Sequence, residues 1–222
     1  MPRTRAVDPA PTTILDAAER LFAERGFRAA TIQELGKASG LSPALIYYYY
    51  HDKAGLYRAV ISRIVHTLAE RGLARLGAST DPADGVRAIV EVQAGYMLEH
   101  PHLARLMARE LVNEGGATAR SAMRDSLAHL FARLRDLIAL GQRTGRFRPD
   151  LDPAYAAVST IAQVAWFAVA SPVVGPLLAP ASAGVTGSAK RPLKAHRQQF
   201  AAHAAAFALS ALERDRSSGA RR

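Results

Sequence analysis

Length, composition and charge set the first limits on this protein. The chain has 222 residues, 49% of them hydrophobic, which suffices for one large domain or two small ones. Cysteine is absent, which excludes disulfides and thiolate metal sites, and no apolar run follows the basic N-terminus, so we expect a soluble cytoplasmic protein. The net charge of +10 suggests an anionic partner, but the excess is spread: +4 over residues 1–80, zero over 81–152 and +6 over 153–222.

The spacing of apolar residues is helical almost throughout, and Val/Ile-rich strand runs bounded by turns are missing, so we expect an all-α protein. The first helix is predicted from about Thr13 to Arg25. Thr13 and Asp16 fit a capping pattern at its start, and Gly26 supplies a left-handed stop at its end.

A short second helix is predicted to begin at Thr31, where Thr31 and Glu34 form a capping box, and to end near Ala38. Gly40 then takes the left-handed conformation of a tight turn.

A third short helix begins after Ser42, a good N-cap, with Pro43 at the first position, where a missing N–H costs nothing. It is predicted to end near Tyr50. Asp52 then caps a long fourth helix over Lys53–Leu76.

The downstream helices are predicted from breaks at Pro and Gly. They cover about residues 83–99, 102–113, 117–141, 154–170 and 196–214. Residues 172–195, rich in Pro, Gly, Ser and Ala, are expected to form a long mobile loop.

Two short helices joined by a tight glycine turn are typical of a helix-turn-helix unit. Ile46 and Tyr50 are expected to face inward on the third helix, whereas Ala44, Tyr47 and Tyr48 face outward. Five of the seven tyrosines fall within eleven residues, from Tyr47 to Tyr57. Such a cluster favours a DNA surface, because phenol hydroxyls donate to phosphates while the rings pack on sugars or thymine methyls.

These residues carry a specific resemblance over about the first 60 positions. The run TIQELGKASGLSPALIYYYYHDK (31–53) resembles the DNA-binding signature of the TetR-type (tetracycline-repressor-like) regulators, and AAERLFAERGF (17–27) resembles their first helix. The chain departs from the pattern at Ala44, where Gly is common, at Tyr50, where Phe is usual, and at Ala54 and Gly55, where acidic residues are usual.

The resemblance implies a three-helix DNA-binding domain over residues 1–55, with its recognition helix at about 42–50. A long helix joins it to a larger ligand-binding and dimerisation domain over 56–222. The positions implied to enter the major groove are Ser42, Pro43, Ala44, Tyr47 and Tyr48. Those implied to hold phosphates are Thr31, Tyr47, Tyr49 and Lys53. Lys53 and Thr31 each lie at a helix start, where phosphate is favoured.

For the C-terminal part, the resemblance implies a cavity among the middle helices for a small, largely apolar effector. Met and aromatic residues line adaptable pockets, and interior polar groups need partners, although packing in the core is the plainer interpretation of most of these positions. The candidate effector contacts are Met97, Met107, Glu110, Asn113, Phe131, Gln163 and Trp166.

Residues 153–189 carry no charge, which by length also fits a transmembrane span. Pro172 and Pro176 interrupt this stretch and leave a helix of about 17 residues, so we expect a helix buried against a partner subunit. The last helix carries a stripe of apolar and small residues suited to the same homodimer interface. These are Phe200, Ala204, Phe207, Ala208 and Ala211.

The expected function is therefore a dimeric regulator, most simply a repressor, that leaves a near-palindromic operator when a small molecule binds. No catalytic motif, cofactor fingerprint or suitably spaced metal-ligand set is present, so we expect no enzyme activity, cofactor or metal. The alternatives are an enzyme on a repurposed scaffold, a sequence-independent nucleic-acid binder using the basic C-terminal tail, and an activator. Arg3 and Arg5 are a candidate minor-groove arm.

Overall fold

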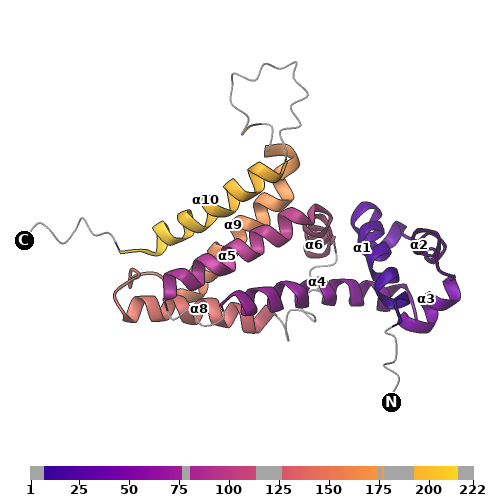
Figure 1. The fold of residues 1–222 in the computed structure, drawn as a ribbon, viewed down its shortest axis with the longest axis horizontal. Coiled ribbons are helices and arrows are strands. Elements are labelled where there is room, and N and C mark those ends of the chain that lie inside the picture. Colours follow the sequence, from indigo (N-terminus) through magenta and orange to yellow (C-terminus); the bar gives the residue numbers. More distant parts are fainter. Residues whose placement is uncertain (1–7, 77–80, 114–126, 175–176, 178–192, 215–222) are drawn as a thin grey trace, which may run out of the picture.

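The computed structural model describes residues 8–76, 81–113, 127–174, 177 and 193–214, and over these the chain is helical (Figure 1). The helices are α1 (Ala10–Ala29), α2 (Ile32–Ser39), α3 (Pro43–Tyr50), α4 (Lys53–Leu76), α5 (Pro82–Glu99), α6 (Pro101–Asn113), α8 (Leu127–Arg143), α9 (Pro153–Val174) and α10 (Leu193–Leu212). Within the described ranges the only extended pairing is an isolated bridge between Phe147 and Glu213. The all-α prediction is confirmed.

Helices α1–α3 form a head at one end of the molecule, and α4 runs from this head alongside α5 and α8 (Figure 1). Beyond the head, α5, α8, α9 and α10 form a second body, which we call the effector domain after the role that the sequence resemblance implies for it. Helix α4 packs on α1 and α3 in the head and on α5 and α8 in the effector domain, and α6 packs against α1. The head is thus joined to the rest through both α4 and α6.

Three clusters of buried apolar side chains hold this arrangement together. The first joins α1–α4 of the head to Tyr96 of α5 and to Leu103 and Leu106 of α6. The second connects α5, α8, α9 and the end of α10, and the third connects α5, α6, α9 and α10. Because the first cluster extends into α5 and α6, the predicted domain boundary at residues 55/56 falls within a continuous core and stays a prediction.

The predicted start of α1 is wrong. The helix begins at Ala10, with Pro11 in its first turn, and its N-cap residue Pro9 makes no side-chain hydrogen bond. The Thr13 hydroxyl instead donates to the carbonyl of the N-cap residue Pro9 (3.0 Å), one turn back, because Thr13 already lies inside the helix.

The left-handed conformation predicted at Gly26 is confirmed, with φ of 81°. Helical hydrogen bonding resumes beyond it, however, and α1 continues through a kink to Ala29 rather than stopping at Arg25.

Helix α9 is longer than predicted. It continues through Pro172 to Val174 and has 22 residues rather than about 17. Proline lacks the N–H that would bond the carbonyl of Ala168, and the Ser171 hydroxyl donates to that carbonyl instead (3.1 Å). The predicted loop over 172–195 is too long at both ends, because residues 172–174 belong to α9 and residues 193–195 to α10. Residues 175–176 and 178–192 lie outside the described residues, as do Arg3 and Arg5.

Candidate nucleic-acid interface

The turn between α2 and α3 has the close geometry of a helix-turn-helix unit. Gly40 has φ of 70°, as predicted, and lets the chain reverse after α2. A Cβ on Gly36 would lie 3.0 Å from the Leu41 carbonyl and 3.3 Å from Cδ of Pro43, so only glycine allows this approach. Leu35 of α2 and Ile46 of α3 are both fully buried, and they belong to the same core, which holds the two helices together.

Local hydrogen bonds hold α3 at its start. The Ser42 hydroxyl accepts from the Leu45 N–H (3.3 Å) with Pro43 at the first helical position, as predicted. Since Ile46 faces the core, the opposite side of α3 is turned to solvent: Ala44 is exposed, and Tyr47 and Tyr48 are 50% and 74% exposed. The predicted outward face of the recognition helix is therefore confirmed.

The other two tyrosines of α3 are hydrogen-bonded within the protein. The Tyr50 hydroxyl donates to the carbonyl of Pro11 (2.9 Å), so the phenol that replaces the usual Phe anchors α3 to α1. The Tyr49 hydroxyl donates to the carboxylate of Asp8, which also accepts from the Ala10 N–H. The bond to Asp8 raises the pKa of Tyr49 to about 12, and the same bond lowers the pKa of Asp8.

Thr31 is exposed at the start of α2, and its polar groups are all occupied. Its N–H and its hydroxyl donate to Oε2 of Glu34 (3.0 and 2.9 Å), and its hydroxyl accepts from the Glu34 N–H (3.2 Å). The predicted capping box is therefore confirmed. A phosphate held by Thr31 has to compete with Glu34.

Lys53 lies at the first turn of α4, against the end of α1. Its ammonium donates to the carbonyls of Ala30 (3.0 Å) and Arg28 (3.4 Å) and lies 4.7 Å from the ring centre of Phe27. An ammonium has three donors, so one remains for a phosphate while the other two join α4 to the end of α1. Sequence reasoning missed this second role, because it depends on how α1 and α4 pack.

Comparison with known proteins bears directly on this geometry. Residues 14–60 match the family of bacterial regulatory proteins called the tetR family, and residues 82–176 match the tetracyclin repressor-like C-terminal domain. The chain belongs to the tetR family.

Curated relatives agree with this assignment. Over 150 residues the chain is 26% identical to the transcriptional repressor NicS of Pseudomonas putida, covering 67% of this chain and 71% of NicS. It is 28% identical over 154 residues to the transcriptional regulator UidR of Escherichia coli K12, covering 66% and 73%. Like other members of the tetR family, the protein is a DNA-binding transcriptional regulator.

Solved structures share the fold. The fatty acid degradation regulator FadR from Bacillus halodurans superposes with a TM-score of 0.71 at 18% identity, over 98% of this chain and all of FadR. The ketosteroid regulator KstR2 of Mycobacterium tuberculosis gives a TM-score of 0.69 at 18% identity, over 94% of this chain and 97% of KstR2. At these identities the likeness shows the fold alone.

In this tetR-family chain, a set of polar contacts joins the head to α6. Glu19 of α1 pairs with His102 of α6 (2.6 Å) and accepts from Arg63 of α4 (2.6 Å). Further along α6, Glu110 is fully buried and its Oε2 accepts from the Tyr57 hydroxyl of α4 (2.9 Å). These contacts link three helices where the head meets the effector domain.

The predicted effector contacts do not form one site. Met97 belongs to the third cluster, Phe131 packs on the second, and Met107 packs on the first. Glu110 lies at the joint with the head, Gln163 donates to Thr160 within α9 (3.3 Å), and Trp166 is 64% exposed. The side chain of Asn113 lies outside the described part of the structure.

Sequence reasoning missed Gln93, a buried amide on the inward face of α5. The available signal was a single Gln at helical spacing among Ile89, Val90 and Met97, in a helix otherwise apolar on that side.

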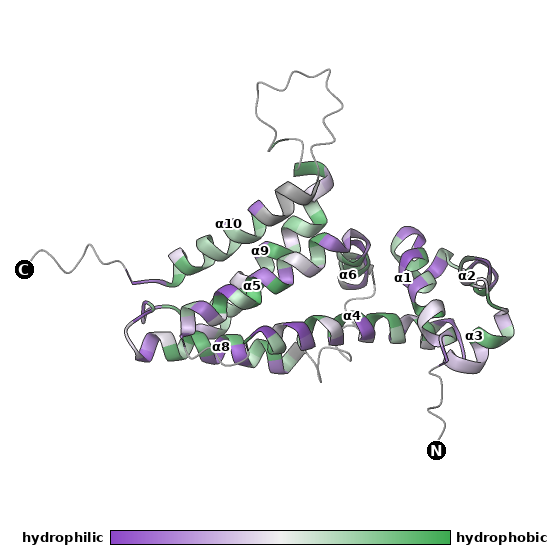
Figure 2. Cartoon of the chain, in the orientation of Figure 1, coloured by the Kyte–Doolittle hydropathy of each residue, from purple (hydrophilic) through white to green (hydrophobic). Residues whose placement is uncertain are grey.

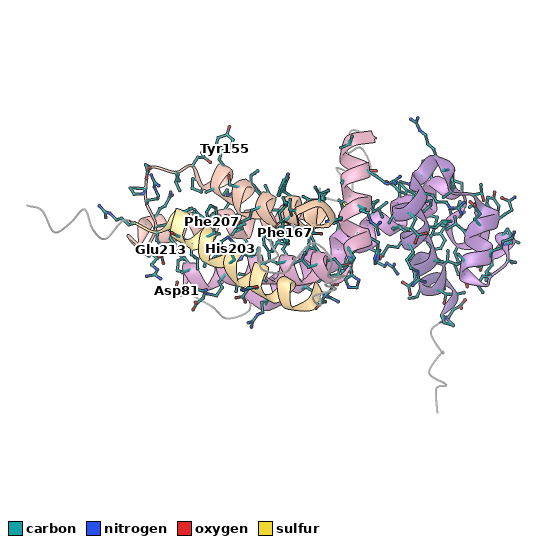
Figure 3. All side chains as sticks on the ribbon, turned by 90° about the horizontal axis from the view of Figure 1, so that it is seen from above. Asp81, Tyr155, Phe167, His203, Phe207 and Glu213 are labelled. Atoms are coloured by element: carbon teal, nitrogen blue, oxygen red, sulfur yellow. The ribbon has the colours of Figure 1, made fainter. Side chains whose placement is uncertain are left out.

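An apolar stripe remains exposed on α9. Its large members are Tyr155, Val158, Trp166, Val169 and Val173. Their spacing of three and four residues, with Ala162 completing the row, places them on one helical face. On the neighbouring α10, Phe207 is exposed with His203 stacked beside it, and Figure 3 shows both on the effector domain, far from the head.

The predicted interface stripe on the last helix is partly wrong. Ala204 and Ala208 are buried in the chain's own third cluster, so they are not available to a partner, whereas Phe207 and Ala211 are exposed. In the figure coloured by hydropathy, α9 and α10 are mostly green to white (Figure 2). Helix α9 is long and apolar enough to cross a membrane by length and composition only, which for one helix is weak evidence.

Proposed function

We propose that this regulator is a cytoplasmic repressor. It binds a near-palindromic operator as a homodimer and releases it when a small, largely apolar molecule enters the effector domain. The single observation that carries the proposal is α3: a short helix fixed by Ser42, Ile46 and Tyr50, with its free side presenting Tyr47 and Tyr48 to solvent.

The tyrosine side of α3 has the chemistry of a DNA surface. A helix of this size enters the major groove, where phenol rings contact thymine methyls and hydroxyls donate to phosphates. Ser42, Pro43 and Ala44, at the start of α3, are exposed and small, so they allow the helix end to approach base edges. Thr31, Tyr49 and Lys53 surround α3 and supply phosphate contacts.

The exposed stripe of α9 supports the homodimer. An apolar row that spans most of a 22-residue helix is large for a monomer surface, and Phe207 is exposed on the neighbouring α10. Packed against its symmetry copy, α9 and α10 form a four-helix interface. In such a dimer we expect the two copies of α3 to contact one face of the duplex, at half-sites one turn apart.

The joint between α1, α4 and α6 supports effector-driven release. A displacement of α6 acts on the head directly, because His102 and Glu110 bond Glu19 and Tyr57. A coupling of about 1–3 kcal/mol between the two sites changes operator affinity about 5- to 150-fold.

The test is selection of bound duplexes from a random pool with the purified full chain, followed by titration at fixed salt. The selected duplex is expected to bind about a thousandfold more tightly than a scrambled one. Tyr47→Ala is expected to weaken operator binding about 5- to 150-fold, the range for one lost base contact, with its helix content unchanged. Arg133→Ala, which removes an exposed cation on α8, serves as the control and keeps wild-type affinity. A well-folded protein with no preference for any duplex contradicts the proposal.

A further inference from the structure

Gln93 has a buried side-chain amide, of which the nitrogen is hydrogen-bonded and the oxygen is not. It lies on α5 with 6% of its surface exposed, and its Nε2 donates to the carbonyl of Ile161 on α9 (3.1 Å). Its Oε1 is fully buried and has no hydrogen-bond partner among the described residues. A buried acceptor without a partner costs folding free energy, so its presence needs a reason.

The orientation of this amide is determined by α9. With Nε2 toward Ile161, a donor meets an acceptor. The flipped amide would set Oε1 against the same carbonyl oxygen, and two acceptors would face each other. The unsatisfied atom is therefore the amide oxygen, a hydrogen-bond acceptor, and a ligand that pairs with it must supply a hydrogen-bond donor.

The surroundings of Gln93 are apolar. Along α5, Val86 and Ile89 before it belong to the second cluster, whereas Ala94 and Met97 after it belong to the third. Gln93 thus lies where the two clusters of the effector domain meet, on the side of α5 that faces α9.

No described buried charge lies in these two clusters. Besides Gln93, the buried polar residues of the described chain are Thr160 and Glu110. The Thr160 hydroxyl donates to the carbonyl of Ala156 (2.8 Å), and Glu110 lies at the head joint with Tyr57. Among the described residues a charged ligand would find no buried counter-ion here. A carboxylate would also place its own acceptor oxygens against the acceptor oxygen of Gln93.

We propose that Oε1 of Gln93 is the polar contact for the effector, and that the effector is an uncharged, mainly apolar molecule with a hydroxyl or amide N–H donor. This rests on the proposed function, because it assumes that a small molecule binds in the effector domain. The apolar walls of the second and third clusters bind the body of the ligand, and Gln93 selects its donor.

The experiment compares two matched probe series by calorimetry on the full chain. One series is decanol, its methyl ether and decanoate, and the other is naphthol, its methyl ether and naphthoate. The wild type is expected to bind one alcohol at least about ten-fold more tightly than its methyl ether, a difference of about 1.4 kcal/mol, and more tightly than its carboxylate.

Gln93→Leu tests the residue. It is expected to bind alcohol and ether within about two-fold of each other, because the acceptor is gone while the apolar walls remain. Without ligand it is expected to melt at the same or a higher temperature, because the unsatisfied oxygen is removed and the Ile161 carbonyl stays in the backbone ladder of α9. Gln199→Leu, which removes an exposed amide on α10, is the control and keeps the wild-type preference.

Any of four binding results would overturn the assignment: equal binding of alcohol and ether to the wild type, a preference that persists in Gln93→Leu, tighter binding of the carboxylate, or no binding in either series. A lower melting temperature of Gln93→Leu would also overturn it by showing a structural role. Titration of the selected duplex without ligand separates the two proposals. If the protein prefers the selected duplex but the calorimetric comparison of the probes gives one of the overturning results, only the assignment of Gln93 is wrong.

Discussion

At the scale of single residues, the four consecutive tyrosines of α3 show how position decides role. Helical spacing turns Tyr47 and Tyr48 to solvent, whereas Tyr49 and Tyr50 meet the start of α1. Tyr50 bonds a carbonyl and is structural. Tyr49 bonds a carboxylate, an anion that a DNA phosphate would have to replace.

Asp8→Asn is therefore expected to raise operator affinity, on the order of two- to five-fold. The change removes a negative charge beside the recognition helix and frees the Tyr49 hydroxyl for a phosphate. It also lowers the pKa of Tyr49 from about 12 toward 10.0, because the carboxylate no longer stabilises the protonated phenol. Binding titrations and a ring-carbon NMR titration measure the two effects. Asp84→Asn, an exposed carboxylate on α5, should change neither, and an affinity loss in Asp8→Asn would show that Asp8 positions α3 for DNA.

At the scale of helices, the starts of α2 and α3 were predictable because their signals are local. The Thr31–Glu34 box, the Ser42 cap and the Gly40 turn each involve residues within four positions of one another. The same kind of pattern failed at Thr13, where an earlier helix start left the threonine inside the helix.

Contacts between helices were not predictable from the sequence. The carbonyls that hold Lys53 come from the far end of α1, and Glu110 faces α4 rather than a ligand. The periodicity that marks a residue as buried does not identify the helix that buries it. The candidate DNA surface, built from local signals, was therefore predicted more fully than the candidate effector contacts.

Thr31→Ala is expected to lower the free energy of unfolding by about 1 kcal/mol, the usual cost of a lost N-cap. Operator affinity should fall as well, because α2 packs against α3, and a less stable start of α2 holds α3 less firmly in position. Thr31→Ser keeps a capping hydroxyl and is expected to restore most of both. Urea unfolding followed by circular dichroism, with duplex titration, measures the two effects. Full stability in Thr31→Ala would mean that Glu34, bonded to the Thr31 N–H, suffices to hold the helix start.

At the scale of the whole molecule, the two ends present different surfaces. The head exposes polar rings and hydroxyls on α3, whereas the far end exposes the apolar row of α9. Helix α4 and α6 connect them, so a change in how two copies meet, or in what the effector domain encloses, acts on the spacing of the heads. Reading two half-sites requires that spacing to match a turn of DNA, about 34–36 Å.

Val169→Asp is expected to separate the homodimer, because it buries a carboxylate within the α9 row when two copies meet. Sedimentation equilibrium should show a monomer at micromolar concentration, with helix content unchanged by circular dichroism. Affinity for the selected duplex should fall by about 10²–10⁴-fold, because each head then binds its half-site alone. Val112→Asp is the matched control: Val112 lies on α6, is 81% exposed against 41% for Val169, and lies outside the row, so this variant should remain a dimer with full affinity. A dimeric Val169→Asp protein would place the subunit interface elsewhere and leave the exposed row of α9 for another partner.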